Sequence, residues 1–119
     1  QASVMINEGL PLYIVARLEQ SFDLAGLTIG ILGMAFKAES DDIRSSLSYK
    51  LKRILRFKAA RVITHDPHVT ADDDLVPLDQ ILDESDVLIL ATPHAVYKDF
   101  TTTKPVIDIW NLREQGVQA

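Results

Sequence analysis

The chain has 119 residues, 47% of them hydrophobic and 24% charged, which suits one compact domain and is too short for two of ordinary size. Its formal net charge of -5 at pH 7 argues against nucleic acid as a partner, because phosphate binding depends mainly on Lys and Arg. The absence of cysteine excludes disulfides, thiolate zinc sites and cysteine nucleophiles within this chain.

The first half of the chain alternates between helix and strand patterns. Apolar residues at three- and four-residue spacings predict a helix over residues 2–22, interrupted at Gly9-Leu10-Pro11, with Pro11 suited to a fresh first turn. Residues 23–26 form a boundary. A nearly continuous apolar run over residues 27–33 then predicts a strand that is covered on both faces. Residues 45–58 predict an amphipathic helix, whose Lys and Arg residues we interpret as its solvated face.

The same alternation continues through the second half. The pattern predicts strands over residues 61–65, 87–91 and 106–109, a short helix over 78–84 and a helical turn over 95–100. Strands that alternate with helices indicate right-handed crossovers and a parallel sheet. The fold class is therefore α/β: a small three-layer, doubly wound Rossmann-like domain with a mainly parallel sheet, preceded by an N-terminal helix.

No segment has the pattern of a membrane span or a secretion signal. No apolar run approaches the roughly 20 residues that cross a bilayer, and no basic stretch precedes an apolar core at the start. We therefore expect a cytoplasmic protein that does not contact a membrane. The chain begins with Gln1 instead of Met, and its first residues resemble the interior of a helix, so we expect it to be a piece of a longer protein.

The loop after the first predicted strand, "GMAFKAESDDIRSS" at residues 33–46, is the first place to look for a ligand. Ligands of doubly wound sheets bind beyond the carboxyl ends of the strands. This loop lacks the G-x-G-x-x-G fingerprint of dinucleotide sites. Asp41 and Asp42 would also oppose a pyrophosphate. We expect them to serve the N-terminus of the following helix, with Ser45 or Ser46 as further caps.

Phe36 and Lys37 are the candidate binding residues of this loop. They could offer an aromatic ring to a base or sugar and a cation to a phosphate. The alternative is that Lys37 is an ordinary solvated residue and Phe36 part of the core. The residue types alone leave both interpretations open.

The turn after the second predicted strand contains Asp66, in the place where dinucleotide folds keep a ribose-binding acid. A simple Asp-Pro turn is the favoured interpretation. His65 and His68 beside Asp66 could suggest a metal, but His-x-x-His without a third converging ligand is a poor zinc signature. We expect structural or solvent-exposed histidines and no metal site.

His94, after the third strand, could face a ligand or belong to an ordinary loop. The spacing of the Ser, His, Asp and Glu residues along the chain does not support a catalytic triad or a catalytic pair of carboxylates.

Four segments in the same order resemble the C-terminal domain of the UDP-glucose/GDP-mannose dehydrogenase family: "GMAFKAESDDIRSSLSYKL", "ARVITHDPHV", "SDVLILATPHAVYKDF" and "VIDIWN". Together they cover residues 25–111. The opening "INEGLPLYIVARLE" is similar to the end of the family's central dimerisation region. The resemblance implies that residues 1–24 are the tail of that connecting helix and that residues 25–119 are a domain that binds a UDP-sugar.

The resemblance also implies an activity for the parent protein. The family oxidises the C6 hydroxyl of a nucleotide sugar to a carboxylate with NAD, in the cytoplasm, for polysaccharide biosynthesis. NAD would be bound mainly by an N-terminal domain outside this chain, and the parent would be a homodimer or larger. By the resemblance, Phe36 and Lys37 contact the substrate and Arg44 contacts NAD. The catalytic cysteine lies in regions that are absent here, so this chain alone is not expected to catalyse the oxidation.

The choice of nucleotide sugar stays open, with UDP-glucose, UDP-N-acetylmannosamine or a similar sugar as candidates. Some family members place a substrate-binding arginine shortly after the last strand, where this chain has Trp110 and Asn111 and its nearest arginine is Arg113. The alternative function is a freestanding, non-catalytic nucleotide-binding or regulatory Rossmann-like module. A purely structural interaction domain is a third possibility.

Overall fold

A single parallel sheet organises the protein. The computed structural model describes residues 9–44 and 46–109, and the strand order in its sheet is β2-β1-β3-β4. The strands are β1 (Thr28–Leu32), β2 (Arg61–His65), β3 (Val87–Leu90) and β4 (Val106–Asp108). All three neighbouring pairs are parallel, so the carboxyl ends of the strands lie along one edge.

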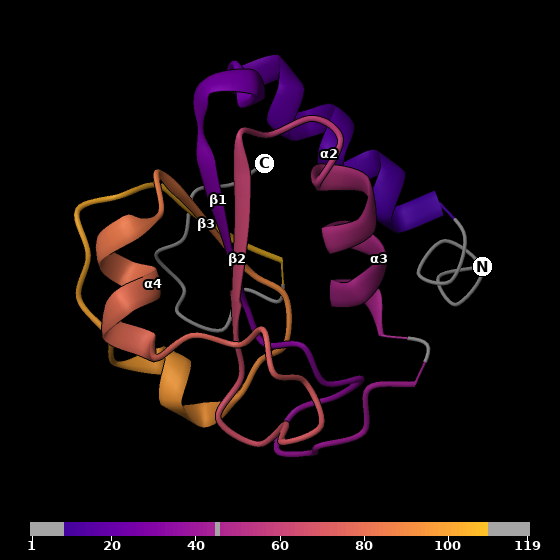
Figure 1. Ribbon diagram of the computed structural model, residues 1–119, viewed down its shortest axis with the longest axis vertical. Coiled ribbons are helices and arrows are strands. Elements are labelled where there is room, and N and C mark those ends of the chain that lie inside the picture. The colour runs from indigo at the N-terminus through magenta and orange to yellow at the C-terminus, as the bar shows by residue number, and fades with distance from the viewer. Residues whose placement is uncertain (1–8, 45, 110–119) are drawn as a thin grey trace.

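Helices cover both faces of this sheet. They are α2 (Leu10–Ser21), α3 (Leu47–Leu55) and α4 (Leu78–Glu84), together with the short 3-10 helices η2 (Leu24–Gly26) and η3 (Ala95–Lys98). Figure 1 shows α2 and α3 on one side of the strands and α4 on the other. The three-layer, doubly wound fold predicted from the alternation of strands and helices is therefore confirmed.

The core lies in two layers, one on each face of the sheet. On the first face, α2 and α3 pack on the sheet through Ile14, Leu18 and Leu51, which are 5%, 1% and 0% exposed. On the second face, α4 and η3 pack through Ile81 and Tyr97, both fully buried. Because both faces are covered, the central strands are apolar throughout, as their sequence indicated.

Most predicted boundaries agree with the structure. The predicted second strand and the helix over residues 78–84 match β2 and α4 residue for residue. Pro11 lies in the first turn of α2, as expected of a residue without an N–H donor. Helix α2 packs on the same core as the sheet, and the boundary proposed at residue 24 stays a prediction. Within the described part of the chain, no helix is long and apolar enough to cross a membrane.

The N-terminus of α3 differs from the expectation for Asp41 and Asp42. The cap is Ser46, whose hydroxyl accepts a hydrogen bond from Ser48 N at 3.1 Å, so the prediction for Ser46 is confirmed. The expectation that the two acids serve this N-terminus was wrong. The helix starts only at Leu47, beyond their reach, and the carboxylate of Asp42 instead pairs with Arg44.

Candidate functional site

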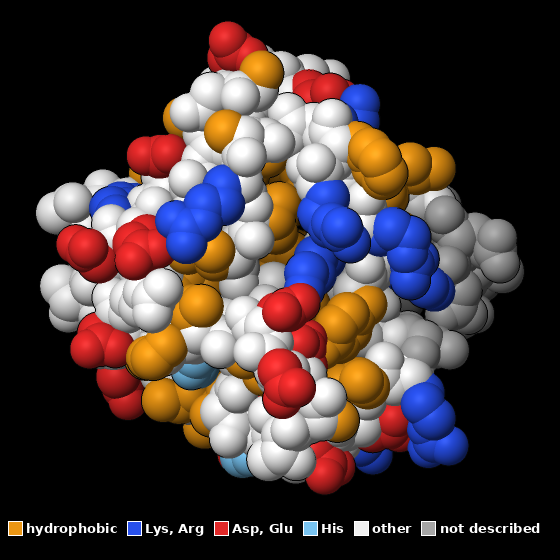
Figure 2. All heavy atoms as spheres, viewed as in Figure 1, with side chains coloured by type: hydrophobic (Ala, Val, Ile, Leu, Met, Phe, Trp, Pro, Cys, Tyr) orange, Lys and Arg blue, Asp and Glu red, His pale blue; other side chains and the backbone are white. Residues whose placement is uncertain are grey.

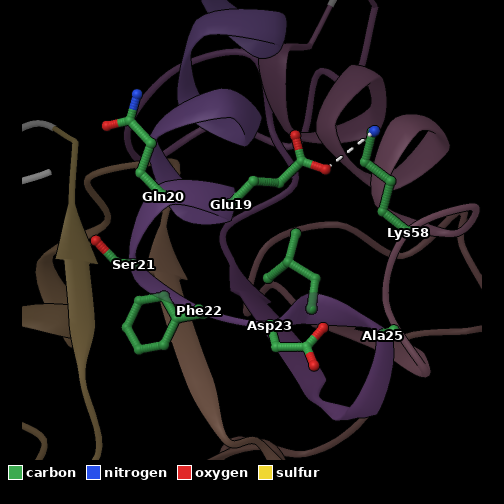
Figure 3. A pocket seen from close by; sticks show the side chains of 8 residues that line it. Glu19, Gln20, Ser21, Phe22, Asp23, Ala25 and Lys58 are labelled. Atoms are coloured by element: carbon green, nitrogen blue, oxygen red, sulfur yellow. Dashed lines mark hydrogen bonds and ion pairs between the residues drawn. The ribbon is translucent and has the colours of Figure 1, made fainter.

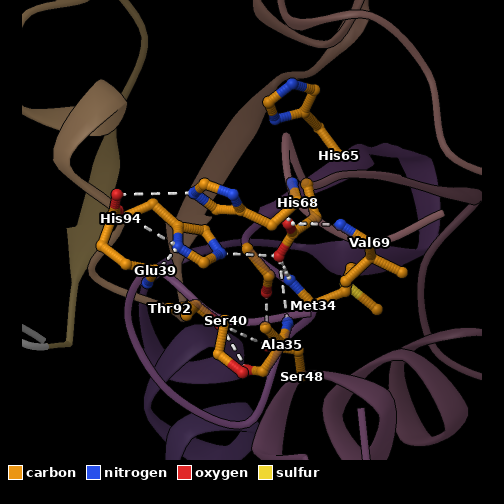
Figure 4. Close-up of polar contacts among 12 residues, drawn as sticks. Met34, Ala35, Glu39, Ser40, Ser48, His65, His68, Val69, Thr92 and His94 are labelled. Atoms are coloured by element: carbon orange, nitrogen blue, oxygen red, sulfur yellow. Dashed lines mark hydrogen bonds and ion pairs between the residues drawn. The ribbon is translucent and has the colours of Figure 1, made fainter. Parts of the chain in front are cut away.

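The loops after β1, β2 and β3 meet at the carboxyl edge of the sheet (Figure 4). The carboxylate of Asp66 lies at their centre. Asp66 is only 6% exposed. Its Oδ2 accepts hydrogen bonds from the backbone N–H groups of Met34 at 2.7 Å and Ala35 at 3.0 Å. Its Oδ1 accepts from His68 N at 2.7 Å and Val69 N at 3.1 Å, which closes the Asp-Pro turn. One side chain thus holds two loops together.

His94 adds the third loop to this network. It is fully buried, and its Nε2 lies 2.8 Å from Asp66 Oδ2. Its Nδ1 accepts a hydrogen bond from Glu39 N at 2.9 Å. Because Nδ1 is an acceptor, Nε2 must carry the proton and donate a hydrogen bond to the carboxylate. The tautomer of His94 is therefore set by its two partners.

The side chain of Asp66 stays ionised at neutral pH. Burial disfavours its ionised form, but the hydrogen bonds from His94, His68 and Met34 outweigh burial and lower its pKa to about 2. All of these donors come from the protein itself. Asp66 therefore acts as a structural acid that joins the loops, and its oxygens are not directed toward a ribose.

Both ends of the segment 33–46 are anchored in the protein. Gly33 has φ 93°, and a Cβ there would lie 2.4 Å from Thr92 Cβ, so only glycine fits. Gly33 N donates to His65 O at 2.8 Å, and Thr92 Oγ1 donates to Ala35 O at 2.8 Å. We call residues 33–35, together with the buried cap Ser46, the anchored ends.

Residues 36–44 between these ends, which we call the outer stretch, carry the predicted binding residues. Phe36 is 53% exposed, and Lys37 and Arg44 are exposed as well. Phe36 is therefore not a core residue. The Arg44 guanidinium donates to Asp42 from Nε at 3.0 Å and from an Nη atom at 2.9 Å. This pairing lowers the pKa of Asp42 to about 2.

The histidine that ends β2 and the one in the following turn point in different directions. His65 is buried, with Nδ1 2.8 Å from the hydroxyl of Tyr97, and burial lowers its pKa. The exposed His68 instead packs edge-on against His94, with ring centroids 4.7 Å apart. The pair suggested by His-x-x-His is thus separated, and both residues fit the predicted structural or exposed roles. Trp110, Asn111 and Arg113 lie outside the described residues.

The sequence did not reveal the convergence of Asp66, Glu39 and His94. These residues are 27 and 28 positions apart in the chain and belong to three loops, so no local spacing connects them. The available signal was topological: each follows a different strand of one parallel sheet, at the edge where such loops meet.

Two recesses lie away from this edge. One, of about 640 Å³, is lined by the end of α2, by η2 and by Lys58, which pairs with Glu19 at 3.1 Å (Figure 3). The other, of about 520 Å³, runs along β2 and is lined by Lys52, Arg56 and Arg61 among others. Figure 2 shows Lys and Arg side chains gathered on this face beside apolar ones. Neither recess contains a residue of the outer stretch.

The comparisons with known proteins point to one family. Residues 30–115 match the model of the UDP-glucose/GDP-mannose dehydrogenase family, UDP binding domain. A UDP-N-acetyl-D-mannosamine dehydrogenase of Pyrococcus horikoshii is 31% identical over 98 residues, covering 78% of this chain and 23% of that protein. A UDP-glucose 6-dehydrogenase of Haloferax volcanii is 40% identical over 70 residues, covering 59% of this chain and 16% of that protein.

The fold comparison agrees with the sequence comparison. The solved structure of a UDP-glucose dehydrogenase from Pyrobaculum islandicum superimposes with a TM-score of 0.78 at 32% identity, covering 93% of this chain and 29% of that one. The chain therefore spans less than a third of the length of these relatives.

Proposed function

The chain belongs to the UDP-glucose/GDP-mannose dehydrogenase family, and on this premise we propose that it binds the UDP part of a nucleotide sugar for an NAD-dependent 6-dehydrogenase. The match of residues 30–115 to the family's UDP binding domain is the observation that carries the proposal. The parent enzyme would oxidise the C6 hydroxyl of UDP-glucose, UDP-N-acetylmannosamine or a similar sugar. Its other domains would supply the NAD site and the catalytic groups, in a cytoplasmic homodimer or larger assembly.

We assign the contact with the nucleotide to Phe36 and Lys37. The exposed ring of Phe36 offers a surface for the base or sugar, and the neighbouring ammonium group attracts a phosphate. The anchored ends support this role, because they fix the backbone on either side of the outer stretch. A loop held in this way loses less conformational freedom when it binds a ligand.

We assign to Arg44 a contact with NAD held by another domain. Its side chain is 88% exposed, which leaves the guanidinium accessible from outside this domain. Its present partner, Asp42, is a partly exposed carboxylate on the same loop. A phosphate of NAD would compete with that carboxylate for the guanidinium donors.

Binding through this domain would orient the substrate while the chemistry takes place elsewhere. In the parent enzyme, Lys37→Ala should therefore raise KM more than it lowers kcat.

The direct test is an NMR titration of the 119-residue chain with UDP, GDP and NAD in separate experiments. We expect UDP to shift the amide signals of Phe36 and Lys37. Lys37→Ala should weaken UDP binding about tenfold, the loss of one charge-assisted phosphate contact worth about 1.4 kcal/mol. Lys58→Ala removes an exposed lysine far from this loop and should leave the affinity unchanged.

Two outcomes would contradict the assignment. If Lys37→Ala and Lys58→Ala bind UDP equally well, Lys37 is not a nucleotide contact. If NAD binds and UDP does not, the chain is a dinucleotide module and not the UDP-binding part of a dehydrogenase. If UDP binds but the parent gene encodes no dehydrogenase, the freestanding regulatory module is favoured.

A further inference from the structure

A compact group of metal-ligating side chains lies beside the outer stretch. One ligand atom each from Glu39, His68 and His94 lies within 4.8 Å of the other two. A Glu39 carboxylate oxygen is 3.5 Å from His68 Nε2, and its other oxygen is 3.5 Å from His94 Nδ1. Figure 4 shows the two rings next to each other with Glu39 facing them.

We propose that Glu39, His68 and His94 form a binding site for a divalent cation of the zinc class. Two imidazoles and one carboxylate are a ligand set that zinc takes in proteins. Tetrahedral bonds of about 2.0–2.1 Å place neighbouring ligand atoms roughly 3.3–3.4 Å apart. Glu39 approaches the two nitrogens at 3.5 Å through different oxygens, and the three ligand atoms lie within 4.8 Å of one another. Movements of about 1 Å would therefore bring them to an ion. This inference differs from the expectation that the chain has no metal site.

Asp66 prepares His94 for this role. Its Oδ2 accepts a hydrogen bond from His94 Nε2, 2.8 Å away, which leaves the Nδ1 lone pair facing Glu39. A buried carboxylate that receives the second ring proton is the usual partner of a metal-binding histidine, because it fixes the ring and makes it more basic. The ligand with the least freedom to move is therefore already oriented.

Two existing hydrogen bonds hold the groups that would bind the ion, one at His94 Nδ1 and one that Glu39 Oε2 accepts from Ala95 N at 2.8 Å, and the ion must replace the first. In this structure Glu39 N donates to His94 Nδ1 at 2.9 Å. Glu39 also has φ 55°, a left-handed conformation that is unfavourable for a non-glycine residue. The movement that frees Nδ1 therefore falls on a residue whose backbone conformation is already unfavourable. Glu39 and His68 are 55% and 39% exposed, so the ion can enter from solvent and keep water as its fourth ligand.

A cation bound here would cross-link the loops after β1, β2 and β3 from the outside, as Asp66 does from the inside. It would hold the middle of the outer stretch against His68 and His94. Its role would be structural and independent of UDP, so this inference can hold or fail separately from the proposed function.

The test is titration of the 119-residue chain with Zn²⁺ and Co²⁺. The chain should carry no histidine tag and be freed of metal with a chelator. Calorimetry should show one ion per chain, and Co²⁺ should give the intense visible absorption of a tetrahedral site. Zn²⁺ should also raise the Tm, because it binds the folded state.

Variants of the two exposed ligands separate a site from general cation binding. Glu39→Gln and His68→Gln should each weaken Zn²⁺ binding at least about tenfold, whereas Asp41→Asn, which removes an exposed acid of the same loop, should not. Circular dichroism checks that each variant folds. Failure to bind one ion per chain, or equal affinity in all three variants, would overturn the proposal.

Discussion

The anchored ends and the outer stretch belong to one loop, yet their chemistry is opposite. Gly33, Met34, Ala35 and Ser46 are buried and bonded to Asp66, Thr92 or helix α3. In the outer stretch, Phe36, Lys37 and Arg44 are exposed. The contrast shows how a small domain can present exposed side chains on a loop whose two ends are fixed. It also predicts that changes at the ends alter stability, while changes in the outer stretch alter binding.

The largest effect is expected for Asp66→Asn. The amide nitrogen of asparagine cannot accept the hydrogen bonds that one carboxylate oxygen now receives, so at least one buried donor loses its partner. Hydrogen bonds to a charged group contribute about 1.5–3 kcal/mol each, and we expect the variant to lose about 3 kcal/mol of unfolding free energy at pH 7. Urea unfolding measures this. Asp73→Asn, at an exposed acid of the following loop, should change little.

The same substitution should alter the pH dependence of stability. The pKa of Asp66 is lowered from 3.8 to about 2 in the folded protein, so its contribution is present above the unfolded pKa and is lost as the pH falls toward 2. That shift corresponds to about 2 kcal/mol. The unfolding free energy of the parent chain should therefore fall between about pH 5 and pH 2. A fall of the same size in Asp66→Asn would show that another group is responsible.

Gly33→Ala tests the anchored end from the backbone side. The new Cβ would overlap Thr92, and φ 93° is unfavourable for alanine, so we expect a loss of about 2–3 kcal/mol. Gly26→Ala is a matched control, because a Cβ at Gly26 meets no atom within 4 Å. Thermal unfolding of both variants measures the difference. Equal Tm values would mean that the contact with Thr92 relaxes without cost.

Ser46→Ala should have a smaller effect at the other anchored end. It removes the hydroxyl that caps α3 by accepting from Ser48 N, which typically costs about 1 kcal/mol. Ser21→Ala, at an exposed serine, provides the control for urea unfolding. If the two variants are equally stable, the cap adds nothing in this protein.

Arg44→Gln, in the outer stretch, should leave stability almost unchanged, because exposed ion pairs contribute little. It should nevertheless raise the pKa of Asp42 from about 2 toward its ordinary value of 3.8. An NMR titration of the Asp42 carboxyl signal measures this, with Arg53→Gln as the control. A measurable loss of stability would mean that the outer stretch is more than a binding surface.

Much of the fold could be predicted from the sequence, because local patterns decide it. The alternation of apolar runs and amphipathic segments identified β2, α4 and the parallel sheet, and a four-segment resemblance identified the family. The anchored network could not be predicted in the same way. Asp66 meets Met34 and His94 only after β1, β2 and β3 have paired, so its burial depends on tertiary structure. Asp42 illustrates the reverse case. A local rule predicted that it would serve a helix terminus, but its carboxylate pairs with the closer guanidinium of Arg44.

The Asp66 network also bears on the lifetime of the folded state. Its carboxylate bonds to Met34 and His94, which lie 32 and 28 positions from Asp66 in the chain, and β1 pairs with β3 across a much longer interval. We expect contacts of such long range to form late in folding, because closing the intervening chain costs entropy before the contact is made. Interactions that are absent from the transition state slow unfolding and leave the folding rate nearly unchanged. Asp66 would then determine mainly how long the domain stays folded, and hence how long the loop beside it keeps its shape.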